Sequence, residues 1–437
     1  MLRFCFVLLF TASSSGLLAQ KKDSLFIQRI ADEILVNGKA YAQLKVLCKT
    51  VGGRLAGSAQ MLQAESWGVK ALQQSGADKV WLQACQVPHW VRGPKEEAYY
   101  LDQGRKVKLD VLALGNSVGT GPQGIKAPVL LIRNFEELEE KKDQVKGKIV
   151  FYNYPFNPRY IKTFQSYGDA VRYRGQGPSR AARYGAVAVI VRSMTHAANN
   201  FPHTGATSYD SAYPKIPAIA VGIEDADRLA AVLTQQKMIT VFLRSQAAQL
   251  PDVTGHNVIG ELVGTDFPEQ IITVGGHLDS WDLATGAIDN GIGSFAVLDI
   301  ARAFMANNIK PKRTIQFVMF MGEEEGLLGS RAYVEDAVKN KTIDQIRYMM
   351  NYDMSNDIKG YSTSAEDSRE LFTSIGAIAH SIDTSFSNLF RVGAGLHSDH
   401  QPFMLQGVPT GGGAGGGLPK NAGPCYHADC EIGRAHV

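Results

Sequence analysis

The chain has 437 residues, of which 45% are hydrophobic and 20% charged, enough apolar content to bury the cores of two or three domains. This composition excludes disordered, collagen-like and coiled-coil proteins. A net charge of +3 is too small for a nucleic-acid-binding surface, so we expect no nucleic acid but a small molecule or a peptide as the partner.

The N-terminal segment has the pattern of a secretory signal. One arginine precedes a short apolar run at 4–10, and small residues follow before Gln20. A membrane anchor needs about 20 consecutive apolar residues, and the serines at 13–15 interrupt the run too early. We therefore expect residues 1–19 to be a signal peptide and the protein to be secreted or periplasmic, without a membrane span.

The pattern of apolar and polar residues changes along the next 230 residues. Helical periodicity runs through 24–75, a β-like run follows at 79–87, and a loop is expected at 88–94. From about residue 120 the chain alternates short apolar runs with helix-like segments and Gly/Pro loops, which predicts a small separate domain. Its expected strands are VLLI at 129–132, KIVFYN at 148–153, GAVAVIV at 185–191 and IPAIAV at 216–221.

A more regular alternation begins after Pro251. Near-continuous apolar strands that alternate with helices predict a buried, mostly parallel sheet flanked by helices, so the expected fold class is α/β. Ligands bind such sheets at the carboxyl ends of the strands. The expected strands are 271–276, 314–320 and 348–353, and the expected helices are 291–306 and 327–338.

Side chains that can bind a metal ion follow these strand ends. Imidazoles and carboxylates are ligands that Zn²⁺ accepts, and so many carboxylates in one place would repel one another without cations. Any one of them more often caps a helix or makes an ordinary hydrogen bond, but their joint placement predicts a metal site. The candidates are His277, Asp279, Asp289, Glu323, Glu324, Asp353 and His427.

Competing catalytic motifs are absent or weak. Neither HExxH nor GxxxxGK[ST] occurs, which excludes those metalloproteases and P-loop proteins. GNSVG at 115–119 matches the GxSxG pattern, with Ser117 as the nucleophile. That pattern needs a helix directly after the serine, and the GTGPQG that follows cannot start one, so we expect a loop.

Taken together, HLDSWD, DNGIG, GEEEGLLGS, NYDM and PCYHADC resemble the co-catalytic di-zinc aminopeptidase family. The interrupted N-terminal half is similar to the carboxypeptidase Q-like branch of that family. The resemblance covers almost the whole mature chain and implies a zinc exopeptidase fold. It implies a peptidase domain in two parts, 20–119 and 247–430, with a β-rich protease-associated domain inserted at 120–246.

The resemblance also implies two zinc ions per chain. Two metal ions about 3.5–4 Å apart lower the pKa of a shared water toward about 7, which yields a bridging hydroxide that attacks the peptide bond. The implied ligands are His277 and Asp353 for the first ion, Glu324 and His427 for the second, and Asp289 as the bridge.

Further roles follow from the same resemblance. Glu323 matches the general base, and Tyr426 matches a phenol that polarises the scissile carbonyl. Asp279 lies two residues beyond His277, so we expect it to orient that imidazole. Glu325 is expected to be a solvated neighbour rather than a catalyst.

The resemblance implies hydrolysis of dipeptides or short peptides. The sequence does not decide whether the enzyme acts at the amino-terminal or the carboxy-terminal end of the substrate. A homodimer is a further expectation. Two alternatives remain: a catalytically inactive receptor-like relative, and a single-zinc glutaminyl-cyclase-like enzyme. All the site positions are intact, which disfavours the first, and the insertion disfavours the second. The segment HSDHQPF at 397–403 is either a wall of the substrate pocket or a locally hydrogen-bonded loop. The glycine tract at 411–417 is expected to be a loop beside the site.

Two features remain near the C-terminus. The last seven residues, EIGRAHV at 431–437, match the translation of a widely used sequencing adapter, so we expect biological sequence to end near Cys430 and discount His436. Four cysteines remain after the signal, which permits two disulfides in an exported protein. We expect one between Cys425 and Cys430, on either side of His427; the alternative is two free thiols.

Overall fold

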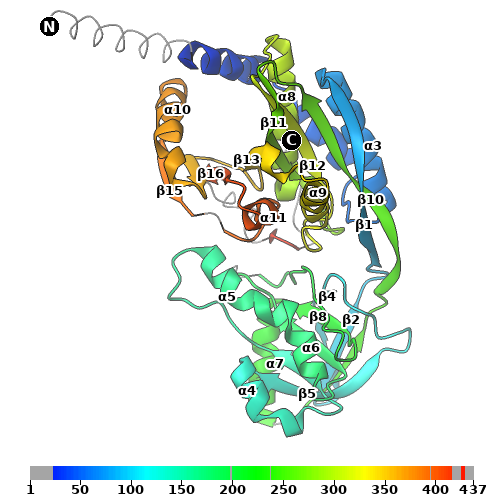
Figure 1. The fold of residues 1–437 in the computed structure, drawn as a ribbon. Coiled ribbons are helices and arrows are strands. Elements are labelled where there is room, and N and C mark those ends of the chain that lie inside the picture. The colour runs from blue at the N-terminus through cyan, green and yellow to red at the C-terminus, as the bar shows by residue number, and fades with distance from the viewer. Residues whose placement is uncertain (1–22, 197–198, 237, 394, 416–424, 429–437) are drawn as a thin grey trace, which may run out of the picture.

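The computed structural model describes residues 23–196, 199–236, 238–393, 395–415 and 425–428. The predicted signal peptide and the adapter-like tail lie outside these residues. Two eight-stranded sheets form two parts of the molecule, one above the other, and the long strands β1 and β10 run from one part to the other (Figure 1). Within the described residues, no helix combines the length and the apolar character needed to cross a membrane.

The first sheet is parallel at its centre and antiparallel toward both sides. β11, β12, β13 and β16 run parallel to their neighbours among these four, whereas β10 is antiparallel to β12 and β14 is antiparallel to β16. This confirms the predicted α/β class. In spatial order, the strands are β1 (Lys79–Val91), β10 (Ala248–Leu262), β12 (Arg313–Phe320), β11 (Phe267–His277), β13 (Ile346–Asn351), β16 (Thr410–Ala414), β14 (Gly360–Thr363) and β15 (Leu389–Val392).

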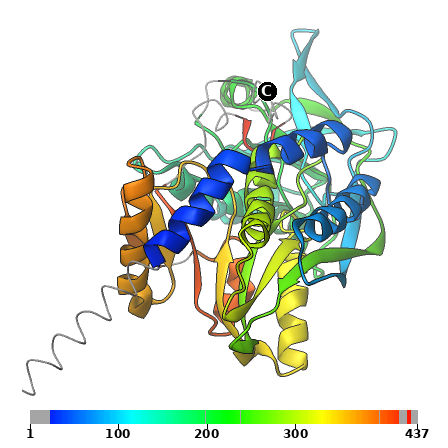
Figure 2. The same ribbon diagram turned by 90° about the horizontal axis from the view of Figure 1, so that it is seen from above.

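Helices cover both faces of this sheet, as the alternation of strands and helices predicts (Figure 2). A helix over residues 23–37, α2 (Ala40–Thr50), α3 (Ala59–Ser75) and α8 (Ile292–Ala306) lie on one side. On the other side are α9 (Leu328–Lys339) and α11 (His400–Leu405), while α10 (Arg369–Ile382) packs on β14 and β15. Two single turns of helix, at Ile343–Gln345 and Glu366–Ser368, and an irregular turn at Ala287–Gly291 complete the described residues of this part.

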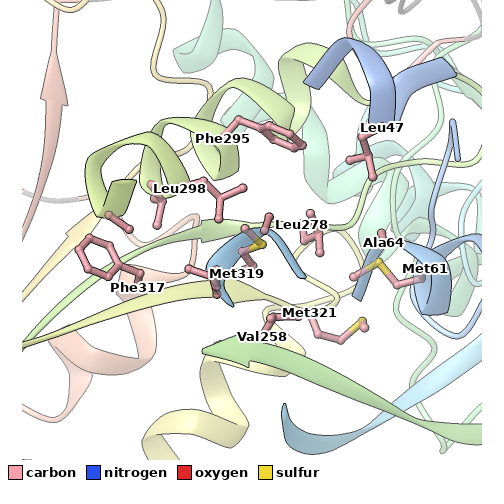
Figure 3. Packing of buried hydrophobic residues seen from close by; sticks show 14 of the residues in the cluster. Leu47, Met61, Ala64, Val258, Leu278, Phe295, Leu298, Phe317, Met319 and Met321 are labelled. Carbon is pink, nitrogen blue, oxygen red and sulfur yellow. The ribbon is translucent and has the colours of Figure 1, made fainter. Parts of the chain in front are cut away.

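The main core of this part lies between the sheet and the layer of α2, α3 and α8 (Figure 3). The start of α3 is fixed by Ser58, whose side chain accepts a hydrogen bond from the Met61 amide, and its end by Gly76 at φ 85°. The apolar faces of the three helices then meet alternate residues of the strands. The buried side chains in this core include Leu47, Met61, Phe295, Leu298, Phe317 and Met319.

The second sheet is the core of the insertion. Its strands in spatial order are β3 (Arg105–Leu109), β2 (Glu97–Asp102), β9 (Thr240–Arg244), β5 (Ile125–Ile132), β6 (Ile149–Tyr152), β7 (Ala188–Arg192), β8 (Ala218–Val221) and β4 (Val111–Ala113). Its helices are α4 (Phe135–Glu140), α5 (Thr163–Gly175), α6 (Gly177–Ala182) and α7 (Ile223–Gln236), with a short turn at Lys142–Gln144. The four apolar runs predicted as strands all occur as strands.

This sheet begins before residue 120, the point at which the sequence pattern changes and at which the insertion was predicted to start. The hairpin of β2 and β3 precedes that point, yet β2 pairs with β9 near the C-terminal end of the insertion. β4 likewise closes the opposite edge by pairing with β8. Pairing partners more than 100 residues apart leave no local pattern, so the sequence alone does not show that these strands join this sheet.

Two expected loops are strands instead. The prediction of a loop at 88–94 is wrong over 88–91, because β1 continues to Val91 beside β10 after a register shift at Pro88, and it holds only for 92–94. The glycine tract does not form a loop over its described part either, since Gly411 to Gly413 lie within β16. A Cβ atom on Gly411 would lie 2.4 Å from the Tyr348 hydroxyl, so glycine is what lets this strand pack so closely.

Candidate metal centre

The predicted ligands meet at the carboxyl edge of the first sheet. His277 is the last residue of β11, and Asp353 lies two residues beyond β13. Glu324 follows β12, Asp289 lies in the turn before α8, and His427 comes from the segment 425–428. Strand exits and helix starts therefore bring together side chains from five separate stretches of the chain, as the βα pattern predicts.

The ligands form two groups with one member in common. In the first group, Nε2 of His277 lies 3.2 Å from Oδ1 of Asp289 and 3.6 Å from Oδ1 of Asp353. In the second, Nε2 of His427 lies 3.3 Å from Oδ2 of Asp289 and 3.3 Å from Oε2 of Glu324. Within each group the potential ligand atoms all lie within 4.8 Å of one another. The two oxygens of Asp289 thus each face a different histidine.

These groups fit two metal ions. Nε2 of His277, Oε1 of Glu324 and Oδ1 of Asp353 are buried and make no hydrogen bond within the described residues. Buried polar atoms normally have a hydrogen-bond partner, because leaving water without one costs free energy. A nitrogen ligand with two carboxylates is a donor set that Zn²⁺ accepts. The residues present therefore suit the co-catalytic zinc ions that the motif pattern implies.

The electrostatics of the site depend on its burial. Burial raises the pKa of Glu323 well above its ordinary value, and the neighbouring carboxylates add to that effect. For Asp289 burial acts in the same direction, but the imidazoles of His277 and His427, in close contact with its two oxygens, outweigh it and hold the pKa far below its usual range. Asp289 therefore remains ionised more readily than Glu323, as a bridging ligand must.

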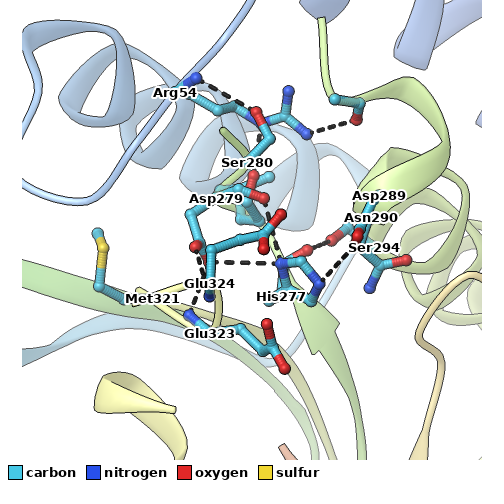
Figure 4. Close-up of polar contacts among 12 residues, drawn as sticks. Arg54, His277, Asp279, Ser280, Asp289, Asn290, Ser294, Met321, Glu323 and Glu324 are labelled. Carbon is cyan, nitrogen blue, oxygen red and sulfur yellow. Dashed lines mark hydrogen bonds and ion pairs between the residues drawn. The ribbon is translucent and has the colours of Figure 1, made fainter. Parts of the chain in front are cut away.

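Asp279 contacts more of the site than the sequence predicts. Its Oδ1 lies 3.5 Å from Nδ1 of His277, in accordance with a role in orienting that ring. In addition, Oδ1 accepts a hydrogen bond from the Glu323 amide at 3.1 Å, and Oδ2 accepts one from the Glu324 amide at 3.2 Å (Figure 4). A single buried carboxylate thus holds His277 and the Glu323–Glu324 turn in a fixed relation.

Glu325, expected to be solvated, is buried. Its side chain lies near Asp279 and Glu324, and burial raises its pKa well above the ordinary value. The expectation was wrong because the turn after β12 packs against the residues that follow β11, which leaves Glu325 only 8% exposed. No catalytic role follows from this placement.

Arg54 is a site residue that the sequence does not reveal. It is fully buried, and its guanidinium donates to the carbonyls of Thr285 at 2.7 Å and Gly286 at 2.9 Å, and also to that of Leu278 (Figure 4). These carbonyls belong to the loop between His277 and Asp289. A lone arginine more than 200 residues away in sequence carries no motif, so only the fold shows that it holds this loop.

The HSDHQPF segment contacts a predicted metal ligand and lines a neighbouring cavity, as a pocket wall would. Ser398 donates a hydrogen bond to Oδ2 of Asp353 at 2.7 Å and accepts one from the Asn351 side chain at 2.7 Å. His397, Ser398 and His400 also line a cavity of ≈ 510 Å³ beside Asp353. The segment therefore orients a predicted ligand and forms one wall of the adjoining cavity.

The insertion reaches the second ligand group. The Thr204 amide donates a hydrogen bond to the His427 carbonyl at 2.7 Å. The Tyr426 ring stacks on His427 with 4.0 Å between centroids, and Phe164 and Tyr167 of α5 contact Tyr426 edge-on at 5.9 and 5.7 Å. Tyr426 thus lies beside the second group, as predicted, but its aromatic partners come from the insertion, which the sequence does not indicate.

The remaining sequence hypotheses have mixed outcomes. Ser117 lies in a buried turn that no helix follows within 118–124, which confirms the loop interpretation of GNSVG. Cys425 is disulfide-bonded, and its predicted partner Cys430 lies outside the described residues. The second permitted bridge does not form, because Cys48 and Cys85 are free thiols: Cys85 packs in the core and the Cys48 thiol faces the Thr285 carbonyl.

Comparison with known proteins places this site in a family. The sequence profile of Peptidase family M28 matches residues 257–432, which include all five predicted ligands. Carboxypeptidase Q of Xenopus laevis is 36% identical over 383 residues, which cover 86% of this chain and 78% of the frog protein. Carboxypeptidase Q of Homo sapiens is 38% identical over 306 residues, 69% of this chain; the match spans 63% of the human protein.

A solved structure extends the likeness to the fold. The peptidase M28 precursor from Shewanella amazonensis superimposes with a TM-score of 0.85 at 27% identity, over 94% of this chain and 91% of that one. Both the ligand-bearing sheet and the insertion are therefore shared with a protein of this family.

Proposed function

This chain belongs to peptidase family M28, among its carboxypeptidase Q-like metallo-exopeptidases, and we propose that it is a secreted or periplasmic di-zinc enzyme that hydrolyses dipeptides or short peptides. The observation that carries the proposal is the division of Asp289 between two ligand groups, each with one histidine and one further carboxylate. This arrangement provides for two ions at one bridging carboxylate, next to a cavity large enough for a small peptide.

The ligand roles follow the two groups. His277 and Asp353 would hold one zinc ion, Glu324 and His427 the other, and Asp289 both. When bound, such a pair of ions polarises the scissile carbonyl and lowers the pKa of water toward about 7. Asp279 contacts both His277 and the Glu323–Glu324 turn, and so would fix the position of a ligand of the first ion relative to a ligand of the second.

Glu323 is the residue we assign to proton transfer. It belongs to neither ligand group, yet it lies beside His277 in the same buried site (Figure 4). As general base it accepts a proton from the attacking water, and it then delivers that proton to the amine that leaves. Tyr426 has its ring against His427, from where its phenol can donate a hydrogen bond to the carbonyl oxygen as that oxygen gains negative charge.

The proposal is tested by counting metal and measuring hydrolysis on one preparation. Two zinc ions per chain, measured by inductively coupled plasma mass spectrometry, together with hydrolysis of unblocked dipeptides would support it. One zinc ion per chain would instead favour the cyclase-like alternative. Two zinc ions with no turnover on any of a panel of blocked and unblocked peptides would favour the inactive relative.

A further inference from the structure

The cavity beside Asp353 has a cation on its far wall. Arg391 lines the cavity from β15, the edge strand of the first sheet. Arg391 is exposed, and its side chain forms no hydrogen bond or ion pair within the described part of the chain. A guanidinium left without an acceptor next to a catalytic site is a group that a substrate can use, because its fork of N–H donors matches a carboxylate.

The sheet fixes how far this cation lies from the metal site. Asn351 pairs with Gly412, Gly412 with Ser362, and Ser362 with Arg391, so the four residues form a row across β13, β16, β14 and β15. All four line the cavity. Because neighbouring strands are about 4.8 Å apart, the row spans about 14 Å from the strand that leads to Asp353 to the strand that carries Arg391.

The pleat of the sheet turns Arg391 toward the cavity. Successive side chains of a strand point to opposite faces, and the neighbours of Ser362 and Arg391 face α10. Tyr361 packs on Phe372 of α10 with 5.1 Å between ring centroids, and the Arg369 guanidinium of α10 lies over the ring of Phe390. Arg391 is thus held on the cavity side by the packing of its neighbours on the other side.

The charges around the cavity favour an anion. Asp353 is the sole carboxylate among the described residues that line it, and that side chain is committed to the first ligand group. His400 also lines the cavity, and burial lowers its pKa below the ordinary value, so it adds no permanent charge. Arg391 is therefore the fixed charge that a ligand meets on the side away from the metal site.

We propose that Arg391 binds the free α-carboxylate of the peptide substrate. The distance from Arg391 to the metal site would then set how many residues lie between the scissile bond and the carboxyl terminus. The inference rests on the proposed function. An extended residue spans about 3.3–3.6 Å, and the arginine side chain itself covers part of the 14 Å row. The remaining space suits a carboxylate one or two residues beyond the scissile bond, as in dipeptides and tripeptides.

The test uses a pair of non-hydrolysable dipeptide analogues in which a methylene-amine replaces the scissile amide. One analogue ends in a free carboxylate and the other in a carboxamide. Their dissociation constants are measured by isothermal titration calorimetry on the zinc-loaded wild type and on Arg391→Gln and Arg391→Lys. Arg369→Gln serves as the matched control, because Arg369 lies on α10 on the opposite side of β15 and pairs with Glu366.

We expect the wild type to bind the carboxylate analogue about tenfold to a hundredfold more tightly than the carboxamide. Arg391→Gln should lose this preference, Arg391→Lys should keep part of it, and Arg369→Gln should keep all of it. Equal binding of the two analogues by the wild type, or an unchanged preference in Arg391→Gln, would overturn the inference. If the enzyme hydrolyses peptides but does not prefer the carboxylate analogue, the inference about Arg391 fails and the proposed function stands. If it prefers the carboxylate analogue but hydrolyses no peptide, only the proposed function fails.

Discussion

The two ligand groups of the metal centre are built on different supports. The first group takes His277 and Asp353 from the ends of two adjacent parallel strands, and Ser398 fixes Asp353 by a hydrogen bond. The second group depends on His427, in a segment that the Thr204 amide of the insertion and the disulfide of Cys425 hold in place. The first group is thus held within the sheet, whereas the second joins Glu324, which follows β12, to a histidine held by distant parts of the chain.

This difference explains what the shared carboxylate does. Asp289 connects a group with a rigid support to one whose support comes from the insertion and the C-terminal segment. We therefore expect changes at Asp289 to affect both metal ions, and changes at the supports to affect one ion more than the other. Substitutions at the bridge and at each support therefore distinguish the two ligand groups.

Asp289→Asn should have the largest effect. A neutral amide cannot balance two dications, so at least one zinc ion should be lost and the rate should fall by more than about 10³-fold. Zinc content and turnover of dipeptides are measured on the same preparation. Zinc content and turnover equal to those of the wild type would show that this carboxylate does not bridge.

Glu323→Gln should separate chemistry from metal binding. The amide cannot accept the water proton, so the rate should fall by about 10²–10⁴-fold while both zinc ions stay bound. Glu324→Gln is the matched comparison one residue away and should lose the second ion. If Glu324→Gln kept both ions while Glu323→Gln lost one, the two glutamates would have the opposite roles.

Ser398→Ala should weaken the first group alone. The substitution removes the hydrogen bond to Asp353, and loss of such a partner of a metal ligand costs about tenfold to a hundredfold in metal affinity. Stepwise removal of zinc with a chelator should then release one ion much earlier than in the wild type. Simultaneous release of both ions would contradict the separate support of the first group.

Reduction of the Cys425 disulfide should weaken the second group, with the smallest effect of the four. We predict Cys430 as the partner, which would close a loop too short to contribute much chain entropy. Reduction should therefore lower zinc affinity and rate several-fold while the melting temperature falls by only a few degrees. The measurement is zinc content, rate and melting temperature with and without a reductant; a large loss of melting temperature with unchanged zinc affinity would contradict it.

The fold of the sheet and the first group could be predicted from sequence because their signals are local. Apolar runs of strand length alternate with helical periodicity, and His277 and Asp353 stand at or just beyond the ends of such runs. The rule that ligands gather at the carboxyl ends of parallel strands then places them together. The end of β1, at 88–91, and the glycines of β16 were predicted as loops, because pairing with distant strands, rather than local composition, makes them strands.

The support of the second group could not be predicted because it depends on long-range contacts. Thr204 acts through its backbone amide, which has no sequence signature, and Phe164 and Tyr167 reach Tyr426 only because the insertion folds toward the peptidase sheet. Arg54 likewise acts on carbonyl groups more than 200 residues away. The resemblance to a family supplied the ligand role of His427, but not what holds it.

The central claim is that two metal ions share Asp289, and anomalous diffraction from zinc-loaded crystals at the zinc absorption edge tests it most directly. We predict two peaks about 3.5–4 Å apart, one beside His277 and Asp353 and the other beside Glu324 and His427, each next to one oxygen of Asp289. A single peak, or two peaks of which one lies away from Asp289, would contradict the account.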